Sequence, residues 1–183
     1  MLYILCALKP EAQAFIDKYK LKKQSLKEYK IFTNQDITLI ISGVGNYNAM
    51  YATQTLINHF DITDDDIYLN IGICGASTQY EIGELINISY IDYKDKNYLV
   101  NNKEAQTIRC CDKAISKDVY PIVDMESFGF YDAIIHSPAI KHRYIFKIVS
   151  DHFEPHCVTK DKTKSLIFKQ LDKIEEILTQ EDL

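Results

Sequence analysis

The stretch YIFKIVSD, residues Tyr144–Asp151, is an apolar run that ends in a carboxylate. A short and nearly continuous apolar run predicts a strand buried on both faces, as in a parallel sheet. The runs Leu2–Ala7 (LYILCA) and Ile67–Ile71 (IYLNI) have the same character. Between these runs lie segments whose apolar residues recur at helical spacing. The alternation predicts an α/β fold, a three-layer αβα sandwich around a mixed, mostly parallel central sheet.

The remaining elements follow from periodicity and turn residues. Helices are expected after Pro10 and over Asn46–Phe60, Glu126–His136 and Thr159–Leu178. Further strands are expected at Tyr29–Thr33, Ile37–Ser42, Leu85–Asp92, Ala105–Arg109 and Ile122–Asp124. The lysine-rich run Lys18–Lys30 is interpreted as a solvated helix end and loop. The 183 residues contain no repeat, low-complexity segment or linker, so a single domain over residues 1–183 is expected.

Composition restricts the classes of function. The net charge of −5 argues against nucleic-acid binding through a basic surface. No apolar run is long enough to span a bilayer, and Met1 leads directly into an apolar strand without a basic leader, so a cytoplasmic protein with no membrane partner is expected. The five cysteines are then expected to be free thiols. His152, His156 and Cys157 have ligand chemistry, but their spacing is common by chance, and no metal site is predicted.

Three acids follow predicted strand ends: Glu11, Glu126 and Asp151. The carboxyl edge of the strands is where open α/β folds bind small ligands, so these acids predict a catalytic crevice. Glu11 and Glu126 lie near helix starts, where a carboxylate also stabilises the helix dipole without any catalytic role. Asp151 ends a strongly apolar strand, and a partly buried carboxyl group there suits acid catalysis. Lys147 is the one charge within that strand; it either extends to solvent or points at an anion in the site.

Two glycine-containing segments could bring backbone close to a ligand. Gly43-Val44-Gly45 lacks the third glycine of a dinucleotide fingerprint, so a nicotinamide-dependent reductase is only weakly indicated. Gly72–Ala76 (GICGA) is interpreted as a loop at a strand end. Its amides could face a polar ligand, or it could be only a tight turn.

Together these segments resemble the nucleoside phosphorylase/nucleosidase superfamily, and within it the 5′-methylthioadenosine/S-adenosylhomocysteine nucleosidases. The matches are collinear over nearly the whole chain: Ala7–Glu11 (ALKPE), Ser42–Gly45 (SGVG), Asn70–Ala76 (NIGICGA), Ile82–Leu85 (IGEL), Val123–Ser127 (VDMES) and Val149–Asp151 (VSD). The resemblance implies a phosphorylase/hydrolase-like domain that cleaves a purine nucleoside in methionine salvage. It also implies a homodimer and a reaction that needs no metal or organic cofactor.

The resemblance also assigns roles. It implies that Glu11 activates water at the anomeric carbon and that Asp151 protonates the imidazole side of the purine, or gives it a strong hydrogen bond. Glu126 would hold the ribose hydroxyls, and Met125 would pack against the ribose. The remaining residues expected to bind substrate are Ile73, Cys74, Lys147 and Ser150. Cleavage of an N-glycosidic bond passes through an oxocarbenium-like sugar, which requires a nucleophile, an acid at the leaving group and a nearby negative charge.

The chain departs from the family at several points. Family members are usually longer, and the shortening falls between Asp92 and Val123; Thr107–Ile115 is interpreted as the remnant, with Ala114 and Ile115 near the base. Lys147 stands where hydrolases of this family carry an arginine near the nucleophilic water, and lysine lacks the bidentate fork.

Two alternative functions are retained. One is a purine nucleoside phosphorylase, although Arg109 and Arg143 are the chain's only arginines and neither matches a phosphate position. Glu11, negatively charged where phosphate would attack, favours water instead. The other is a catalytically impaired nucleoside-binding protein.

Overall fold

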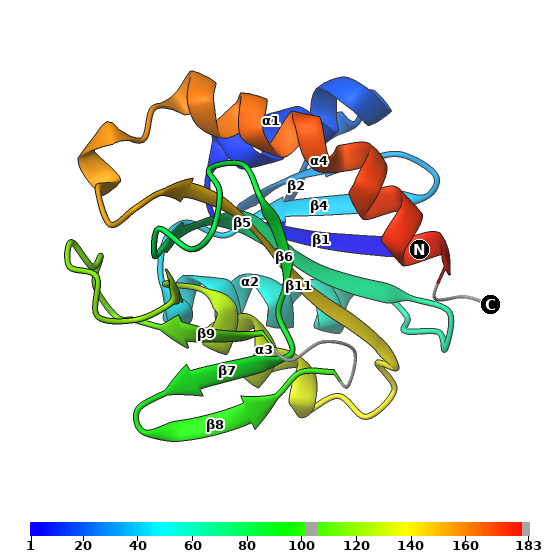
Figure 1. Ribbon diagram of the computed structural model, residues 1–183. Helices are drawn as coiled ribbons and strands as arrows, with labels where there is room; N and C mark the ends of the chain where they lie inside the picture. The colour runs from blue at the N-terminus through cyan, green and yellow to red at the C-terminus, as the bar shows by residue number, and fades with distance from the viewer. Residues whose placement is uncertain (102–105, 181–183) are drawn as a thin grey trace.

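The computed structural model describes residues 1–101 and 106–180 (Figure 1). One mixed sheet lies between two pairs of helices. Helices α1 (Lys9–Tyr19) and α4 (Lys160–Gln180) cover one face, and α2 (Asn46–His59) and α3 (Ser127–Ile135) cover the other (Figure 1). This arrangement confirms the predicted three-layer αβα sandwich. No helix in the described ranges combines the length and the apolar character needed to cross a membrane.

The sheet contains both parallel and antiparallel pairs of strands. The strands are β1 (Leu2–Cys6), β2 (Lys22–Leu26), β3 (Tyr29–Thr33), β4 (Ile37–Ile41), β5 (Ile67–Ala76), β6 (Leu85–Asn87), β7 (Tyr90–Tyr93), β8 (Lys96–Leu99), β9 (Thr107–Cys110), β10 (Ile122–Asp124) and β11 (His142–Asp151). The centre, β4-β1-β5-β11, is parallel. The hairpins β2-β3-β4 and β7-β8 are antiparallel, and so are the pairs of β6 with β11 and of β10 with β5.

Strand β5 changes its neighbour partway along one edge. Its first residues, Ile67–Asn70, pair with β1, whereas Gly75 and Ala76 pair with β10 on the same edge. The opposite edge pairs with β11 from Ile67 to Gly75. Between the end of β1 and β10 the edge of β5 is therefore open, and a discontinuity of this kind is where open sheets bind ligands.

The core has two halves because side chains alternate across each strand. On β11, Ile145 and Val149 pack on the α2 and α3 face, and Phe146 and Ile148 pack on the α1 and α4 face. Helix α4 contributes buried residues at spacings of three and four: Ile167, Leu171, Ile174 and Leu178. The two layers of helices hold the sheet rigid below the site.

Three predictions at the level of elements are wrong. The expected loop in Lys18–Lys30 contains β2, an exposed edge strand whose lysines protect the sheet edge from pairing with another chain. Gly72–Ala76 is not a loop, because β5 continues through it. The single strand Leu85–Asp92 is divided into β6 and β7. Strand β8 was not predicted, because its sequence KNYL is polar. The predicted strand Ala105–Arg109 corresponds to β9, and Ala105 lies outside the described residues.

Candidate active site

A cavity of about 330 Å³ opens where β5 changes its neighbour. This volume is within the range of small-ligand sites. Residues that line it lie in 7–11, 44, 73–75, 111–115, 123–126 and 150–158. Seven residues predicted for the site are among them: Glu11, Ile73, Cys74, Met125, Glu126, Ser150 and Asp151. Ala114 and Ile115 also line the cavity, so the segment interpreted as a remnant contributes to this site.

Glu11 lies in the first turn of α1 with its carboxylate held from two sides. The amide of Leu8 donates to Oε2 at 2.8 Å, and the amide of Ile73 donates to Oε1 at 3.0 Å. A Cβ atom at position 72 would lie 2.9 Å from Oε1, so the carboxylate occupies the space that Gly72 leaves. Burial raises the pKa of Glu11, while the two amides and the charge of Lys147 act in the opposite direction. Glu11 is thus a buried carboxylate, and each of its oxygens accepts a hydrogen bond from a different segment of backbone.

Asp151 ends β11 and is also held through both oxygens. The Glu154 amide donates to Oδ1 at 2.7 Å, which the left-handed backbone of Phe153 (φ 62°) makes possible by turning the chain back. Ser150 Oγ lies 2.6 Å from Oδ2 and 3.0 Å from the carbonyl oxygen of Cys74. The hydroxyl has one proton. It donates to an ionised Asp151, or it donates to Cys74 while accepting from a protonated Asp151. The same geometry thus accommodates either direction of the Ser150 hydroxyl.

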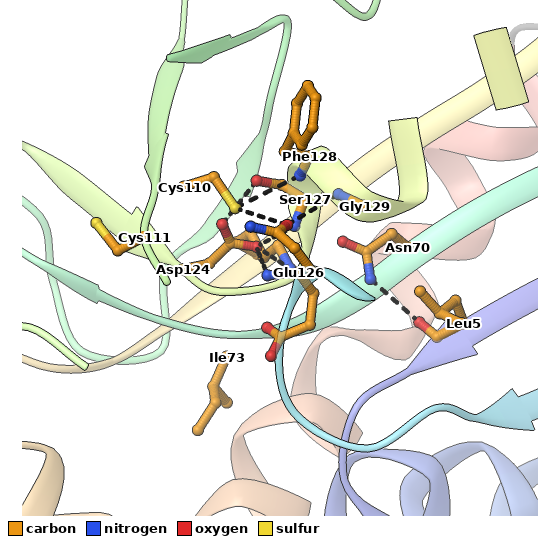
Figure 2. A network of polar contacts seen from close by, with 12 residues as sticks. Leu5, Asn70, Ile73, Cys110, Cys111, Asp124, Glu126, Ser127, Phe128 and Gly129 are labelled. Atoms are coloured by element: carbon orange, nitrogen blue, oxygen red, sulfur yellow. Dashed lines mark hydrogen bonds and ion pairs between the residues drawn. The ribbon is translucent and has the colours of Figure 1, made fainter. Parts of the chain in front are cut away.

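Glu126 projects from the turn between β10 and α3. Its Oε1 accepts a hydrogen bond from the Gly45 amide at 2.9 Å, so the glycine turn presents a donor to a carboxylate and not to a dinucleotide. Figure 2 shows this side chain extending away from the polar cluster of Asp124 and Ser127. Burial, followed by the negative charge of Asp124, raises the pKa of Glu126 to about 7.

Asp124 fixes the turn that carries Met125 and Glu126, a role that was not predicted. It accepts from the Ser127 amide at 2.9 Å and from the Ser127 hydroxyl at 2.6 Å (Figure 2). The signal was its place inside the quoted segment VDMES, directly before the two residues assigned to the ribose.

Lys147 does not line the cavity, although it was predicted to bind substrate. Its side chain is 1% exposed, and Nζ lies 2.8 Å from Oδ2 of Asp124. The alternative in which Lys147 extends to solvent is therefore wrong. Burial alone would lower the pKa of Lys147, but the surrounding carboxylates of Asp124, Glu126 and Glu11 outweigh it and raise the pKa.

The loop after β11 contains the residues considered as metal ligands. His152 Nδ1 lies 2.9 Å from the Ala76 carbonyl oxygen. Glu154, His156 and Cys157 bring ligand atoms within 4.8 Å of one another, but all three are exposed and none lines the cavity. The expectation that the reaction needs no metal stays a prediction.

No protein-family model and no curated protein matches the sequence. Solved structures match its fold. A 5′-methylthioadenosine/S-adenosylhomocysteine nucleosidase from Colwellia psychrerythraea, in complex with adenine, has a TM-score of 0.73 at 18% identity, with 94% of each chain covered. The enzyme from Neisseria meningitidis, in complex with methylthio-immucillin-A, has a TM-score of 0.76 at 13% identity, with 96% of this chain and 98% of that chain covered. A 5′-methylthioadenosine nucleosidase from Arabidopsis thaliana has a TM-score of 0.74 at 14% identity, with 94% of this chain and 96% of that chain covered. The chain thus has the fold of the 5′-methylthioadenosine/S-adenosylhomocysteine nucleosidases.

Proposed function

We propose that the protein hydrolyses the N-glycosidic bond of a purine nucleoside of the methylthioadenosine or adenosylhomocysteine type. The observation that carries the proposal is the convergence of Glu11, Glu126 and Asp151 on one cavity of this fold. Solved structures of the same fold contain adenine or methylthio-immucillin-A.

Each carboxyl group has a role that its surroundings support. Glu11, a buried base with both oxygens fixed, takes a proton from water as the water oxygen bonds to the anomeric carbon. The electrons of the C–N bond pass to the purine, which receives a proton or a strong hydrogen bond from Asp151 at its imidazole side. Glu126 holds the ribose hydroxyls and places negative charge near the oxocarbenium-like sugar. Met125 packs against the ribose, and Ile73, Cys74 and Ser150 complete the cavity wall.

The geometry disfavours phosphorolysis. Phosphate sites are built with arginine, yet Arg109 pairs with Asp92 at 2.9 Å, and Arg143 donates through Nε to the Val100 carbonyl at 3.0 Å. Neither arginine lines the cavity, whereas Glu11 does. The binding-only alternative is disfavoured because all three acids reach the same cavity. The expected homodimer, the cytoplasmic location and the absence of a nucleic-acid partner stay predictions.

Base release from a panel of nucleosides tests the proposal. Methylthioadenosine, adenosylhomocysteine, adenosine and inosine are incubated with the protein, with and without phosphate, and products are separated by chromatography. We expect free adenine from the first two, at a rate that does not depend on phosphate. Release that requires phosphate would move the protein to the phosphorylases. Thermal stabilisation by these nucleosides without any release would support the binding-only alternative.

The variant Glu11→Gln separates catalysis from binding. We expect hydrolysis to be lost while nucleoside binding, measured by calorimetry, changes less than about tenfold, because the amide oxygen can still accept from one backbone amide. The matched control is Glu28→Gln, at an exposed position away from the cavity. Loss of binding together with activity would make Glu11 a binding residue and contradict its assignment as the base.

A further inference from the structure

Behind the cavity lies a buried positive charge to which the proposed chemistry assigns no task. Lys147 is the one lysine or arginine that is buried in the described part of the chain. It lies between Ile145 and Val149 on β11, whose side chains face α2 and α3. Its register partner on β5 is Gly72, so the lysine and the space filled by the Glu11 carboxylate belong to neighbouring positions of the sheet.

Three buried carboxyl groups act on this one cation: Glu11 in α1, and Asp124 and Glu126 in the turn after β10. Asp124 contacts it directly at 2.8 Å, and Glu126 and Glu11 act on it through their charge. All three carboxyl groups are less than 9% exposed. Three carboxylates buried together are costly unless a positive charge compensates them.

The other titratable groups around Lys147 cannot supply that charge. The thiols of Cys6 on β1, Cys74 on β5 and Cys110 on β9 are buried, and burial raises the pKa of each, so they are neutral at physiological pH. Asp151 and Glu84, which act on Cys74, are themselves acids. Lys113 also lines the cavity, but it is exposed. Lys147 is therefore the buried source of compensation within the described surroundings of the cluster.

We propose that Lys147 is a positioning residue whose ammonium group, anchored by Asp124, favours the ionised forms of Glu11 and Glu126 from behind the cavity and so opposes the effect of their burial. This inference rests on the proposed function, because an ionised Glu11 is needed to accept a proton from water. Its charge favours the ionised form of both glutamates, and its direct partner Asp124 fixes the turn that carries Glu126. Lys147 thus acts on the reaction without contact with the nucleoside.

The test is a charge cycle of three variants: Lys147→Met, Asp124→Asn and the double variant. The pH dependence of kcat/KM is recorded for each. We expect the acidic limb of Lys147→Met to move up by about one pH unit or more, the size of effect that a nearby opposite charge has on a carboxyl group. Asp124→Asn should move the limb down, and the double variant, which removes one charge of each sign, should lie close to the wild type.

A second readout needs no substrate. In protein labelled with 13C at the glutamate carboxyl carbon, the titrations of Glu126 and Glu11 are followed by NMR and assigned with Glu126→Gln and Glu11→Gln. Both should titrate at higher pH in Lys147→Met. Lys147→Arg, which keeps the charge, should titrate like the wild type. The control Lys164→Met removes a surface pair with Asp17 and should change neither readout.

The outcomes separate the two proposals. If the wild type releases no base but both glutamates titrate higher in Lys147→Met, the proposed function fails and the role of Lys147 in their ionisation stands. If base is released, but the acidic limb of kcat/KM and the titrations of Glu11 and Glu126 are unchanged in Lys147→Met, the inference is overturned. Should Lys147→Met not fold, the double variant is compared with Asp124→Asn, from which it differs only at position 147; identical acidic limbs and titrations would overturn the inference.

Discussion

The hydrogen bonds of Asp151 suit the proton transfer that we propose for it. Both carboxyl oxygens are fixed, by Ser150 and by the Glu154 amide, and the serine can reverse its hydrogen bond. We expect Asp151→Asn to reduce kcat by about 100-fold or more, the usual contribution of an acid, because an amide cannot release a proton to the purine. Base release measures kcat, and circular dichroism monitors the fold. Asp118→Asn, at an exposed position, is the control, and wild-type turnover in Asp151→Asn would remove the acid role.

Glycine is needed at position 72 because the Glu11 carboxylate occupies the space of a side chain, and not because the backbone has a positive φ. A methyl group there would lie 2.9 Å from Oε1 of Glu11, so Gly72→Ala must displace that carboxylate or shift β5. We expect activity to fall at least about tenfold, since misplacement of a reacting group by about 1 Å can cost 100-fold. Unfolding by urea should show a loss of stability of only about 1–3 kcal/mol, as for other overpacked sites. Full activity in Gly72→Ala would mean that the position of Glu11 is not critical.

At the scale of elements, α2 and α3 approach so closely that only glycine fits between them. A Cβ atom on Gly129 would lie 1.9 Å from the backbone oxygen of Asn46, whose side chain accepts from the Gly129 amide at 2.9 Å. Helix propensity alone predicts that Gly129→Ala stabilises α3 by about 1 kcal/mol. The contact predicts the opposite, a loss of about 3 kcal/mol or more in the free energy of unfolding, from overpacking against backbone. Chemical denaturation decides the sign, and Ile135→Ala, exposed at the end of the same helix, should stay within about 0.5 kcal/mol of the wild type.

The elements that could be predicted are those whose sequence carries a strong local pattern. The apolar runs that form β1, β5 and β11 have that pattern, and so has the apolar face of α4. Strands β2 and β8 have polar sequences, because they lie in hairpins near the sheet edges and are held by pairing and not by burial.

The site was predictable to the extent that it lies at strand ends. Glu11 follows β1 and Asp151 ends β11, so these two acids lie at the carboxyl ends of parallel strands as predicted. Glu126 follows β10, which runs antiparallel to β5, so it reaches the same cavity from a strand of opposite direction. The ion pair between Lys147 and Asp124 was not predictable, because β10 and β11 do not pair and are related only through β5. This contact depends on the register of β10 with β5 and on that of β11 with β5, and no local sequence pattern predicts both.

At the scale of the whole molecule, the buried acid Glu126 links stability to pH. Its pKa is about 7 in the folded protein and near 4.5 when unfolded. Between these values the folded state binds the extra proton, so the contribution of this group to stability is complete below pH 4.5 and is lost as the pH rises to 7. Glu126→Gln does not titrate. As the pH rises from 4.5 to 7, the free energy of unfolding of this variant should therefore increase by up to about 3 kcal/mol relative to the wild type, at about 1.36 kcal/mol per pKa unit. Above pH 7 the difference should stay constant. Urea unfolding at several pH values measures the difference; a difference that does not change with pH would contradict it.

The place of β11 has a consequence for synthesis on the ribosome. This strand follows the other described strands of the sheet in chain order, yet it pairs with β5 along almost its whole length and ends in Asp151. A nascent chain that ends before His142 exposes an unpaired, apolar edge of β5, which is the kind of surface that aggregates or recruits chaperones. Glu11 precedes β11 in the chain, so Glu11 and Asp151 can form one cavity only after β11 has been synthesised. The proposed activity should therefore arise only after β11 has left the ribosome.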